Sequence, residues 1–194
     1  MLKRIGILIF DDVEELDFVG PLEVFGMISC ANQLEIMIVA ETVHEVRCHY
    51  GLRVVPSHSL DQCPPLDLLI VPGGPGARKH ARENPAILEF VRRQEGYLAS
   101  VCTGALVLAS AGVLKNENAT THHNRLEMLR EYPGVKVERD VRLVIGDRVA
   151  TSAGVSAGID LSLALLARWW GEDVAQQVAE NMEWESEAWK MATI

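Results

Sequence analysis

Residues 98–108 read LASVCTGALVL and place one cysteine, Cys102, between an apolar run and a string of small residues. Tyr97–Val101 has the composition of a buried strand, and Thr103–Ala111 has that of a helix that Gly112 can end. Cys102 is therefore expected at the turn from a strand into a helix. Two interpretations of its thiol are open: a buried structural cysteine, or a nucleophile on a strand-to-helix elbow.

Strand-like and helix-like segments alternate around this turn along the whole chain. Apolar runs predict core strands at Lys3–Phe10, Leu34–Ala40, Leu66–Val71 and Tyr97–Val101, and shorter strands at Val135–Glu138, Val141–Ile145 and Val149–Thr151. Val46–Cys48 and Leu52–Pro56 predict a hairpin. A helix is predicted with Pro21 in its first turn and its end near Ala31. Further helices are predicted at Pro85–Gln94, Thr103–Ala111, Asn124–Glu131, Val155–Trp170 and Asp173–Trp184. This order predicts one doubly wound α/β domain over residues 1–194, with a mainly parallel sheet and helices on both faces.

Composition narrows the class of protein. The 194 residues are 48% hydrophobic and 23% charged, which is the balance of a soluble globular protein. A net charge of −9 and a pI near 5.1, without a Lys/Arg-rich tract, argue against a nucleic-acid partner. The N-terminal apolar run is too short for a secretory signal, and Ile159–Trp170 is too short to span a bilayer. We therefore expect no membrane partner and a cytoplasmic location. The four cysteines lack the spacing of a zinc site or a disulfide framework.

Doubly wound sheets bind ligands beyond the carboxyl ends of their strands, where Cys102 is expected. A thiol at a helix N-terminus faces the positive end of the helix dipole and unpaired N–H groups, which favour the thiolate. The turn at residues 72–76, PGGPG, follows another core strand. Alone, such a turn more often only reverses the chain. Beside the thiol, the amides of Gly74 and Thr103 are expected to form an oxyanion-type hole.

A carboxyl group follows the first strand, in LDFVGP at residues 16–21. Asp17 lies between apolar residues, unlike the neighbouring acids, which are typical of a solvated loop. Apolar surroundings raise the pKa of a carboxyl group, so that it exchanges a proton near neutral pH. The alternative role of Asp17 is to cap the helix expected to start at Pro21. Thiol, amide donors and carboxyl group together predict an acyl-transfer or addition site.

The same residues carry a family resemblance. The stretches GILIFDDVEELDFVGPLEVF, LDLLIVPGGPGA, SVCTGALVLASAGVL, ATTHH and TSAGVSAGIDLSLALLA follow one another over roughly residues 3–183. With them the chain resembles the DJ-1/PfpI superfamily, also called ThiJ/PfpI. The resemblance implies a flavodoxin-like, class I glutamine amidotransferase-like fold, usually a homodimer, with Cys102 as the elbow nucleophile.

Two positions indicate which branch of that superfamily the chain resembles. Protease-like members carry His after the cysteine, where this chain has Thr103, and the acidic partner is usually Glu, where this chain has Asp17. Together with ATTH and AGID, these residues resemble the isocyanide hydratase branch. They also resemble the ligand-binding N-terminal domains of a group of AraC-type regulators. Those regulators continue into a helix-turn-helix domain, and because this sequence ends at Ile194 without one, a DNA-binding role is not expected.

The hydratase resemblance implies that Cys102 attacks the isocyanide carbon, that Asp17 transfers protons, and that Thr103 assists with its backbone N–H and hydroxyl. The product is an N-substituted formamide, and no metal or organic cofactor is required. The substrate is a small-molecule electrophile, and the residues expected to bind it are Gly73, Gly74, Thr103, His122, Gly154 and Val155. Asp160, in AGID, is expected to have a structural role.

Two alternatives remain open at this point. The first is a glyoxalase- or deglycase-like attack of Cys102 on a 2-oxoaldehyde, in which His122 assists proton transfer. The second is a redox or small-molecule sensor, in which Cys102 is oxidised or only lines a pocket.

Overall fold

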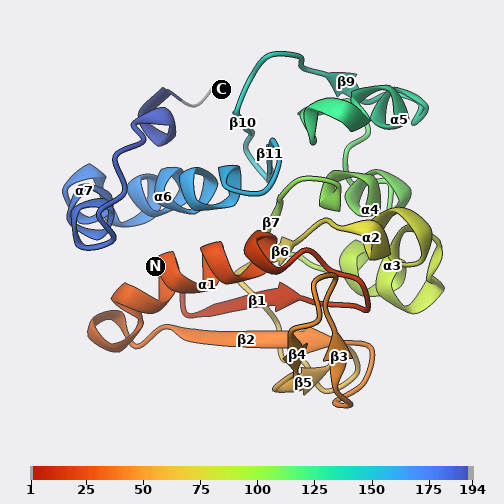
Figure 1. Ribbon diagram of the computed structural model, residues 1–194, viewed down its shortest axis with the longest axis horizontal. Helices are drawn as coiled ribbons and strands as arrows, with labels where there is room; N and C mark the ends of the chain where they lie inside the picture. The colour runs from red at the N-terminus through yellow and green to blue at the C-terminus, as the bar shows by residue number, and fades with distance from the viewer. Residues whose placement is uncertain (1, 192–194) are drawn as a thin grey trace.

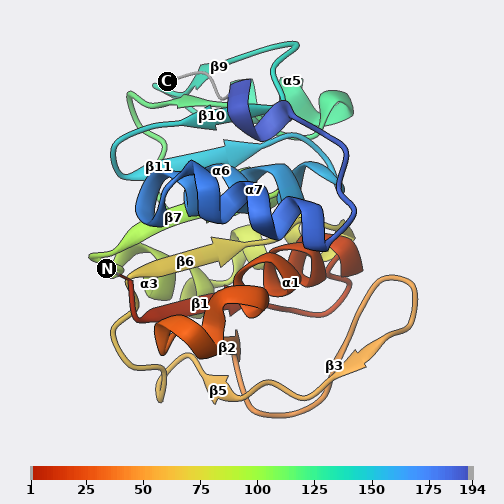
Figure 2. The same ribbon diagram turned by 90° about the vertical axis from the view of Figure 1, so that its left-hand side faces the viewer.

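A computed structural model describes residues 2–191 as a central sheet between two layers of helices (Figures 1 and 2). The main sheet has seven strands in the order β10-β11-β7-β6-β1-β2-β5. They are β1 (Arg4–Leu8), β2 (Glu35–Ala40), β5 (His58–Ser59), β6 (Leu68–Val71), β7 (Tyr97–Ser100), β10 (Leu143–Ile145) and β11 (Val149–Ser152). Every pairing in this sheet is parallel except that of β10 with β11. The predicted doubly wound, flavodoxin-like fold with a mainly parallel sheet is confirmed.

Helices cover both faces of the sheet. They are α1 (Glu15–Asn32), α2 (Pro75–Lys79), α3 (Pro85–Arg92), α4 (Gly104–Ser110), α5 (Leu126–Arg130), α6 (Ala157–Trp170) and α7 (Glu172–Asn181), with single 3-10 turns at η1 (Ala81–Glu83), η2 (His123–Arg125) and η3 (Ala188–Met191). Figure 2 shows α1, α6 and α7 on one side of the sheet and α3 on the other. The layer of α3 also contains α2 and α4, which pack against one another. No described helix is long and apolar enough to cross a membrane.

The strands are apolar because both of their faces are covered. All four residues of β6 are buried, as are Ile5, Ile7 and Leu8 of β1. Two short pairings lie outside the main sheet: the predicted hairpin, formed by β3 (Val46–Arg47) and β4 (Arg53–Val54), and the parallel pair β8 (Asn118–Ala119) and β9 (Lys136–Val137).

The prediction that a helix begins at Pro21 is wrong. α1 begins at Glu15 and contains Pro21 in its interior. Proline has no N–H, so the carbonyl of Asp17 loses the bond that residue 21 would donate in a regular helix. Asp17 consequently lies in the first turn of α1 and does not cap a helix at Pro21. The other predicted elements are present with ends that differ by a few residues, whereas α2, β5, β8 and the 3-10 turns η1 and η3 were not predicted.

The end of α4 follows the sequence prediction. Gly112 adopts a φ of 81°, and the N–H of Val113 bonds the carbonyl of Leu108 at 3.0 Å. The N–H of Gly112 bonds the carbonyl of Ala109 at 2.9 Å, which completes a Schellman cap. This cap fixes the length of the helix that follows Cys102.

Candidate active site

Four loops meet at the carboxyl edge of the parallel sheet, and each brings part of one site. The loop after β1 leads to Asp17, the loop after β6 carries Gly73, and the loop after β7 carries Cys102. The loop after β11 brings Val155 to the same place. Because β1, β6, β7 and β11 are parallel neighbours, their carboxyl ends lie at one edge, where such sheets bind ligands.

Cys102 occupies a strained elbow. Its φ of 56° lies in the left-handed region, which non-glycine residues rarely adopt. The elbow is held by two contacts: the N–H of Cys102 donates to the carbonyl of Ala153 at 3.0 Å, and the Thr121 hydroxyl donates to the carbonyl of Cys102 at 2.7 Å. At Gly104, a Cβ would lie 2.0 Å from the carbonyl oxygen of Val71, so the turn requires glycine there.

Asp17 lies beside this elbow and is fully buried. Its Oδ2 accepts the N–H of Gly73 at 2.8 Å, while its buried Oδ1 accepts no hydrogen bond of normal geometry from the described residues. Burial raises the pKa of Asp17 to about 7, and the hydrogen bond from Gly73 and weaker interactions with the Cys102 thiol and the Val155 N–H oppose this rise. A side chain at residue 73 is excluded, because its Cβ would lie 2.8 Å from Oδ2 and 2.5 Å from the Thr103 nitrogen.

The thiol and the carboxyl group form a coupled pair. Burial, and to a smaller extent the negative charge of Asp17, raise the pKa of Cys102 to about 12, although hydrogen bonds from Thr103 and Val155 oppose the rise. Burial and the charge of Asp17 thus oppose the stabilisation of the thiolate that is expected at the N-terminus of the short α4. Between pH values of about 7 and 12, the pair holds one proton.

The amides around the sulfur differ from the expected pair. The N–H of Gly74 donates to the Thr103 hydroxyl oxygen at 3.0 Å, and that hydroxyl faces the Gly74 carbonyl at 3.3 Å. The expectation that Gly74 supplies an oxyanion donor is therefore wrong. The backbone N–H groups that do face Cys102 belong to Thr103 and Val155. Val155 has a φ of 48°, which is a real strain for a β-branched residue.

A pocket of about 240 Å³ opens onto Cys102, while the fully buried Asp17 does not line it. Four of the predicted residues line it, namely Gly74, Cys102, His122 and Val155, and five further residues complete it, namely Glu14, Tyr50, Arg78, Asn124 and Arg125. Gly154 lies behind the wall, since a Cβ there would be 2.4 Å from Cδ2 of His122. No role was predicted for these five residues or for Thr121, although Glu14 and Thr121 lie within stretches that carry the family resemblance.

His122 presents a neutral imidazole to the pocket. Its Nδ1 accepts the N–H of Asn124 at 3.2 Å, so Nδ1 carries no proton in this arrangement. Burial lowers the pKa of His122, and electrostatic interactions with His123, Arg125 and Arg78 lower it further. Within residues 2–191, no group of three His, Cys, Asp or Glu side chains is arranged to hold a metal ion.

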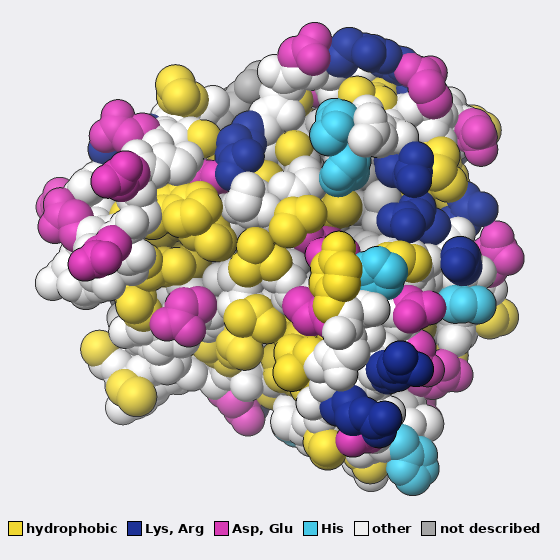
Figure 3. Space-filling model, in the orientation of Figure 1, with side chains coloured by type: hydrophobic (Ala, Val, Ile, Leu, Met, Phe, Trp, Pro, Cys, Tyr) yellow, Lys and Arg dark blue, Asp and Glu magenta, His cyan; other side chains and the backbone are white. Residues whose placement is uncertain are grey.

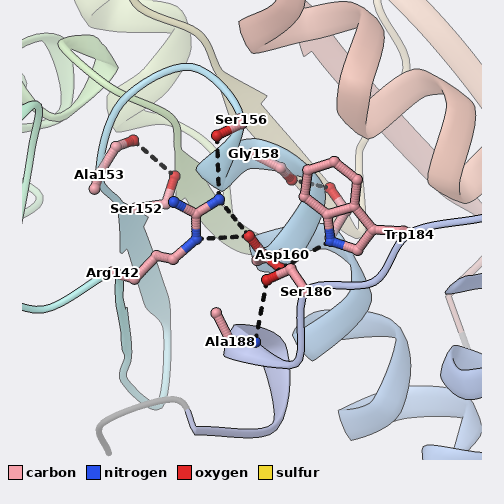
Figure 4. Close-up of polar contacts among 10 residues, drawn as sticks. Arg142, Ser152, Ala153, Ser156, Gly158, Asp160, Trp184, Ser186 and Ala188 are labelled. Atoms are coloured by element: carbon pink, nitrogen blue, oxygen red, sulfur yellow. Dashed lines mark hydrogen bonds and ion pairs between the residues drawn. The ribbon is translucent and has the colours of Figure 1, made fainter.

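A buried polar network supports the turn that carries Val155 (Figure 4). Asp160 of α6 is fully buried and accepts hydrogen bonds from Nε of Arg142 at 2.6 Å, from Nε1 of Trp184 at 3.0 Å and from Oγ of Ser186 at 2.8 Å. Nη2 of Arg142 also donates to Oγ of Ser156 at 3.2 Å. Asp160 is thus structural, as expected, and its network joins the turn after β11 to the segment that follows α7.

Known proteins are similar to this chain in sequence and in fold. Over 187 residues the chain is 34% identical to an isonitrile (isocyanide) hydratase from Pseudomonas putida, covering 95% of this chain and 79% of the relative. It is 30% identical over 161 residues to the glutathione-independent glyoxalase DJR-1.2 from Caenorhabditis elegans, covering 80% and 82%. Among solved structures, a ThiJ/PfpI family protein from Pseudomonas syringae superposes with a TM-score of 0.88 at 29% identity, covering 96% of this chain and 77% of that one. The sequence pattern of the DJ-1/PfpI family matches residues 3–168, and this chain belongs to that family.

Proposed function

We propose that the protein is a cysteine-dependent isocyanide hydratase that converts R–N≡C and water into an N-substituted formamide. The observation that carries the proposal is the buried pair of Asp17 and Cys102, which holds one proton above pH 7. Hydration of an isocyanide needs a nucleophile for the terminal carbon and a proton for the same carbon, and this pair supplies both. The hydratase from Pseudomonas putida, similar over most of its length, supports the same assignment.

The first proposed step joins sulfur to carbon. The Asp17 carboxylate accepts the thiol proton of Cys102, and the sulfur attacks the terminal carbon of the isocyanide. Asp17 then returns the proton to that carbon, which gives a thioimidate, R–N=CH–S–Cys102. The backbone N–H groups of Thr103 and Val155 stabilise the sulfur as it loses its proton.

The second proposed step releases the product. Asp17 accepts a proton from water, whose oxygen attacks the thioimidate carbon, and passes this proton to the substrate nitrogen. The tetrahedral intermediate forms its C=O bond and breaks the C–S bond, which returns the proton to the sulfur and leaves R–NH–CHO. These steps use no metal or organic cofactor.

The location and the assembly of the enzyme are proposed as well. We propose one domain over residues 1–194, located in the cytoplasm and assembled as a homodimer, with a small-molecule electrophile as its only ligand. Neither nucleic acid nor membrane is a proposed partner.

Formation of the formamide from phenyl isocyanide, followed by liquid chromatography, tests this function. Wild type is expected to turn over, Cys102→Ala to lose all turnover, and Asp17→Asn to lose a factor of about 10²–10⁴. Lys79→Gln, an exposed change on α2, is the control for folding and charge. Absence of formamide with wild type would overturn the proposal, as would full activity in Cys102→Ala.

A glyoxalase activity is the second candidate, because His122 lines the same pocket and the glyoxalase from Caenorhabditis elegans is a relative. Methylglyoxal supplied to the same samples tests it. Lactate formation that depends on both Cys102 and His122, without hydration of an isocyanide, would replace the hydratase assignment.

A further inference from the structure

Two arginine side chains line the pocket at Cys102. Arg78 lies on α2 and Arg125 ends η2, so they reach the pocket from different parts of the chain. Both residues are half-buried, and neither forms an ion pair with a described residue. Arg78 makes no side-chain hydrogen bond within residues 2–191, and Arg125 donates only to the carbonyl of Asn124 at 3.0 Å.

Neighbouring arginines behave differently. Arg130 and Arg139 both pair with Glu127, close in sequence to Arg125, and Arg82 pairs with Glu83, close to Arg78. In a chain with a net charge of −9, carboxylates are abundant, yet neither guanidinium group at the pocket forms an ion pair with a carboxylate of the described residues. Figure 3 shows several Lys and Arg side chains on the right-hand side of the face drawn there, in the region of α2, α4 and α5.

The other charged groups of the site leave these arginines available. Glu14 is the acidic side chain among the lining residues, and burial raises its pKa, while the charge of Arg78 lowers it, but no ion pair joins Glu14 to either arginine. Asp17 lies behind the thiol, fully buried, and its Oδ2 is bound by the N–H of Gly73. His122 also lines the pocket, and its lowered pKa keeps the imidazole neutral. Guanidinium groups bind carboxylates through parallel N–H donors, and Arg is the side chain best suited to that role.

We propose that Arg78 and Arg125 form a subsite for an anionic group, and that the substrate is a small electrophile bearing a carboxylate. The nature of the electrophile, an isocyanide, rests on the proposed function, whereas the anion subsite does not. The pocket volume of about 240 Å³ admits one aromatic ring or a short chain with its carboxylate. It is smaller than the pockets of about 300–1,000 Å³ that take drug-sized ligands.

The charge selectivity of Cys102 alkylation tests the subsite without any turnover. Iodoacetate is an anion and iodoacetamide is neutral. The rate of Cys102 alkylation by iodoacetate divided by the rate with iodoacetamide, measured by peptide mass spectrometry, therefore reports the local electrostatic potential. Arg78→Gln is expected to lower this ratio about 3- to 10-fold, the double variant with Arg125→Gln further, and 0.5 M NaCl to reduce the difference. Arg78→Lys is expected to keep most of it. The exposed Cys30 is an internal reference in every sample, and Lys79→Gln is the matched control.

A second readout uses a carboxylate ligand. By titration calorimetry, 4-formamidobenzoate is expected to bind wild type at least 5-fold more tightly than its methyl ester, and the double variant is expected to lose this preference. Hydration of 4-isocyanobenzoate and of its ester then separates the two proposals. Turnover of both at equal kcat/KM, with no ligand preference, overturns the subsite and keeps the hydratase. Turnover of neither, with an arginine-dependent alkylation ratio, keeps the subsite and overturns the hydratase.

Discussion

At Asp17, the fold keeps a carboxyl group in a place where its charge is costly. The side chain is fully buried and has one backbone N–H at 2.8 Å for its two oxygens. Its raised pKa shows that the native state prefers the protonated acid up to about pH 7. A purely structural position would favour Asn or an apolar residue, so the retained acid points to proton transfer.

This cost gives a stability prediction for Asp17→Asn. The unfolded acid ionises near the ordinary aspartate pKa of 3.8 and the native acid near 7, so the native state binds more protons across that interval. Stability from this group is complete below pH 4 and is lost as the pH rises through 7, by about 4 kcal/mol in all. Asp17→Asn is therefore expected to be more stable than wild type by about 2–4 kcal/mol at pH 8 and equal to it near pH 4. Urea unfolding at both pH values checks this, and equal stability at pH 8 would contradict it.

The same titration predicts the pH profile of the reaction. Below pH 7 both groups of the pair are protonated, and Asp17 cannot accept the thiol proton. The value of kcat/KM is therefore expected to rise about tenfold per pH unit up to about pH 7 and then level off. Stopped-flow measurements between pH 5 and 9 check this profile, with Asp17→Asn as the variant in which the rising limb disappears. A profile that stays flat across pH 7 in wild type would exclude Asp17 as the base.

Residues of the site differ in how far the sequence predicts them. Cys102 and Asp17 are recognisable because each is a reactive group in an unusual local setting, one between small residues and one between apolar residues. Arg78 and Arg125 look like ordinary surface arginines, because their role depends on α2 and η2 meeting at the pocket. The use of the Gly74 N–H by Thr103 also depends on tertiary contacts, and no local pattern announces it.

At the scale of elements, α1 shows how packing overrides a local signal. Pro21 costs a helix interior about 3 kcal/mol and is a common start signal. The residues before Pro21 are nevertheless well packed: Phe18 is buried in the core, and Gly20 lies so close to α6 that a Cβ there would be 3.0 Å from Ile159. Burial of this turn offsets the cost of the proline, and it also places Asp17 beside the thiol.

The network around Asp160 predicts a coupling between α6 and the site. Arg142→Met leaves the buried carboxylate of Asp160 without its cationic partner and frees Ser156, next to the strained Val155. We expect a loss of about 2–4 kcal/mol in unfolding free energy, and a lower kcat with little change in KM, since the Val155 N–H is less well placed. Urea unfolding and steady-state kinetics measure the two effects.

The double variant Arg142→Met/Asp160→Asn is the control for this network. Removing both partners eliminates the unpaired charge, so its loss of stability is expected to be smaller than the sum of the two single losses. Simple additivity, or an Arg142→Met variant as stable as wild type, would show that the network does not support the turn.

At the scale of the whole molecule, the alternation of strands and helices was sufficient to predict the fold. A buried parallel sheet requires apolar strands and intervening helices, and both leave strong patterns in the sequence. The antiparallel placement of β10 and the pairing of β5 involve only three and two residues, too few to specify a partner by pattern. Such edges are decided by the surrounding loops.

The outer surface supports the proposed homodimer and gives its test. Figure 3 shows hydrophobic side chains gathered over α1 and α6, and Leu16 and Met27 of α1 are 37% and 41% exposed. These two residues are eleven positions apart, about three helical turns, so they share one face of α1. Burying that face against a second copy removes apolar area from water, and repulsion between two chains of charge −9 opposes this association.

In sedimentation equilibrium we expect a particle of twice 21.4 kDa, whose association is tighter at 0.5 M than at 0.05 M NaCl. Association of the Met27→Glu variant is expected to be at least tenfold weaker. Glu23→Gln, on the same helix, is the charge control and is expected to associate at least as well as wild type. A monomeric wild type at 100 µM chain would rule out the dimer, and a Met27→Glu variant that associates like wild type would place the interface on another face.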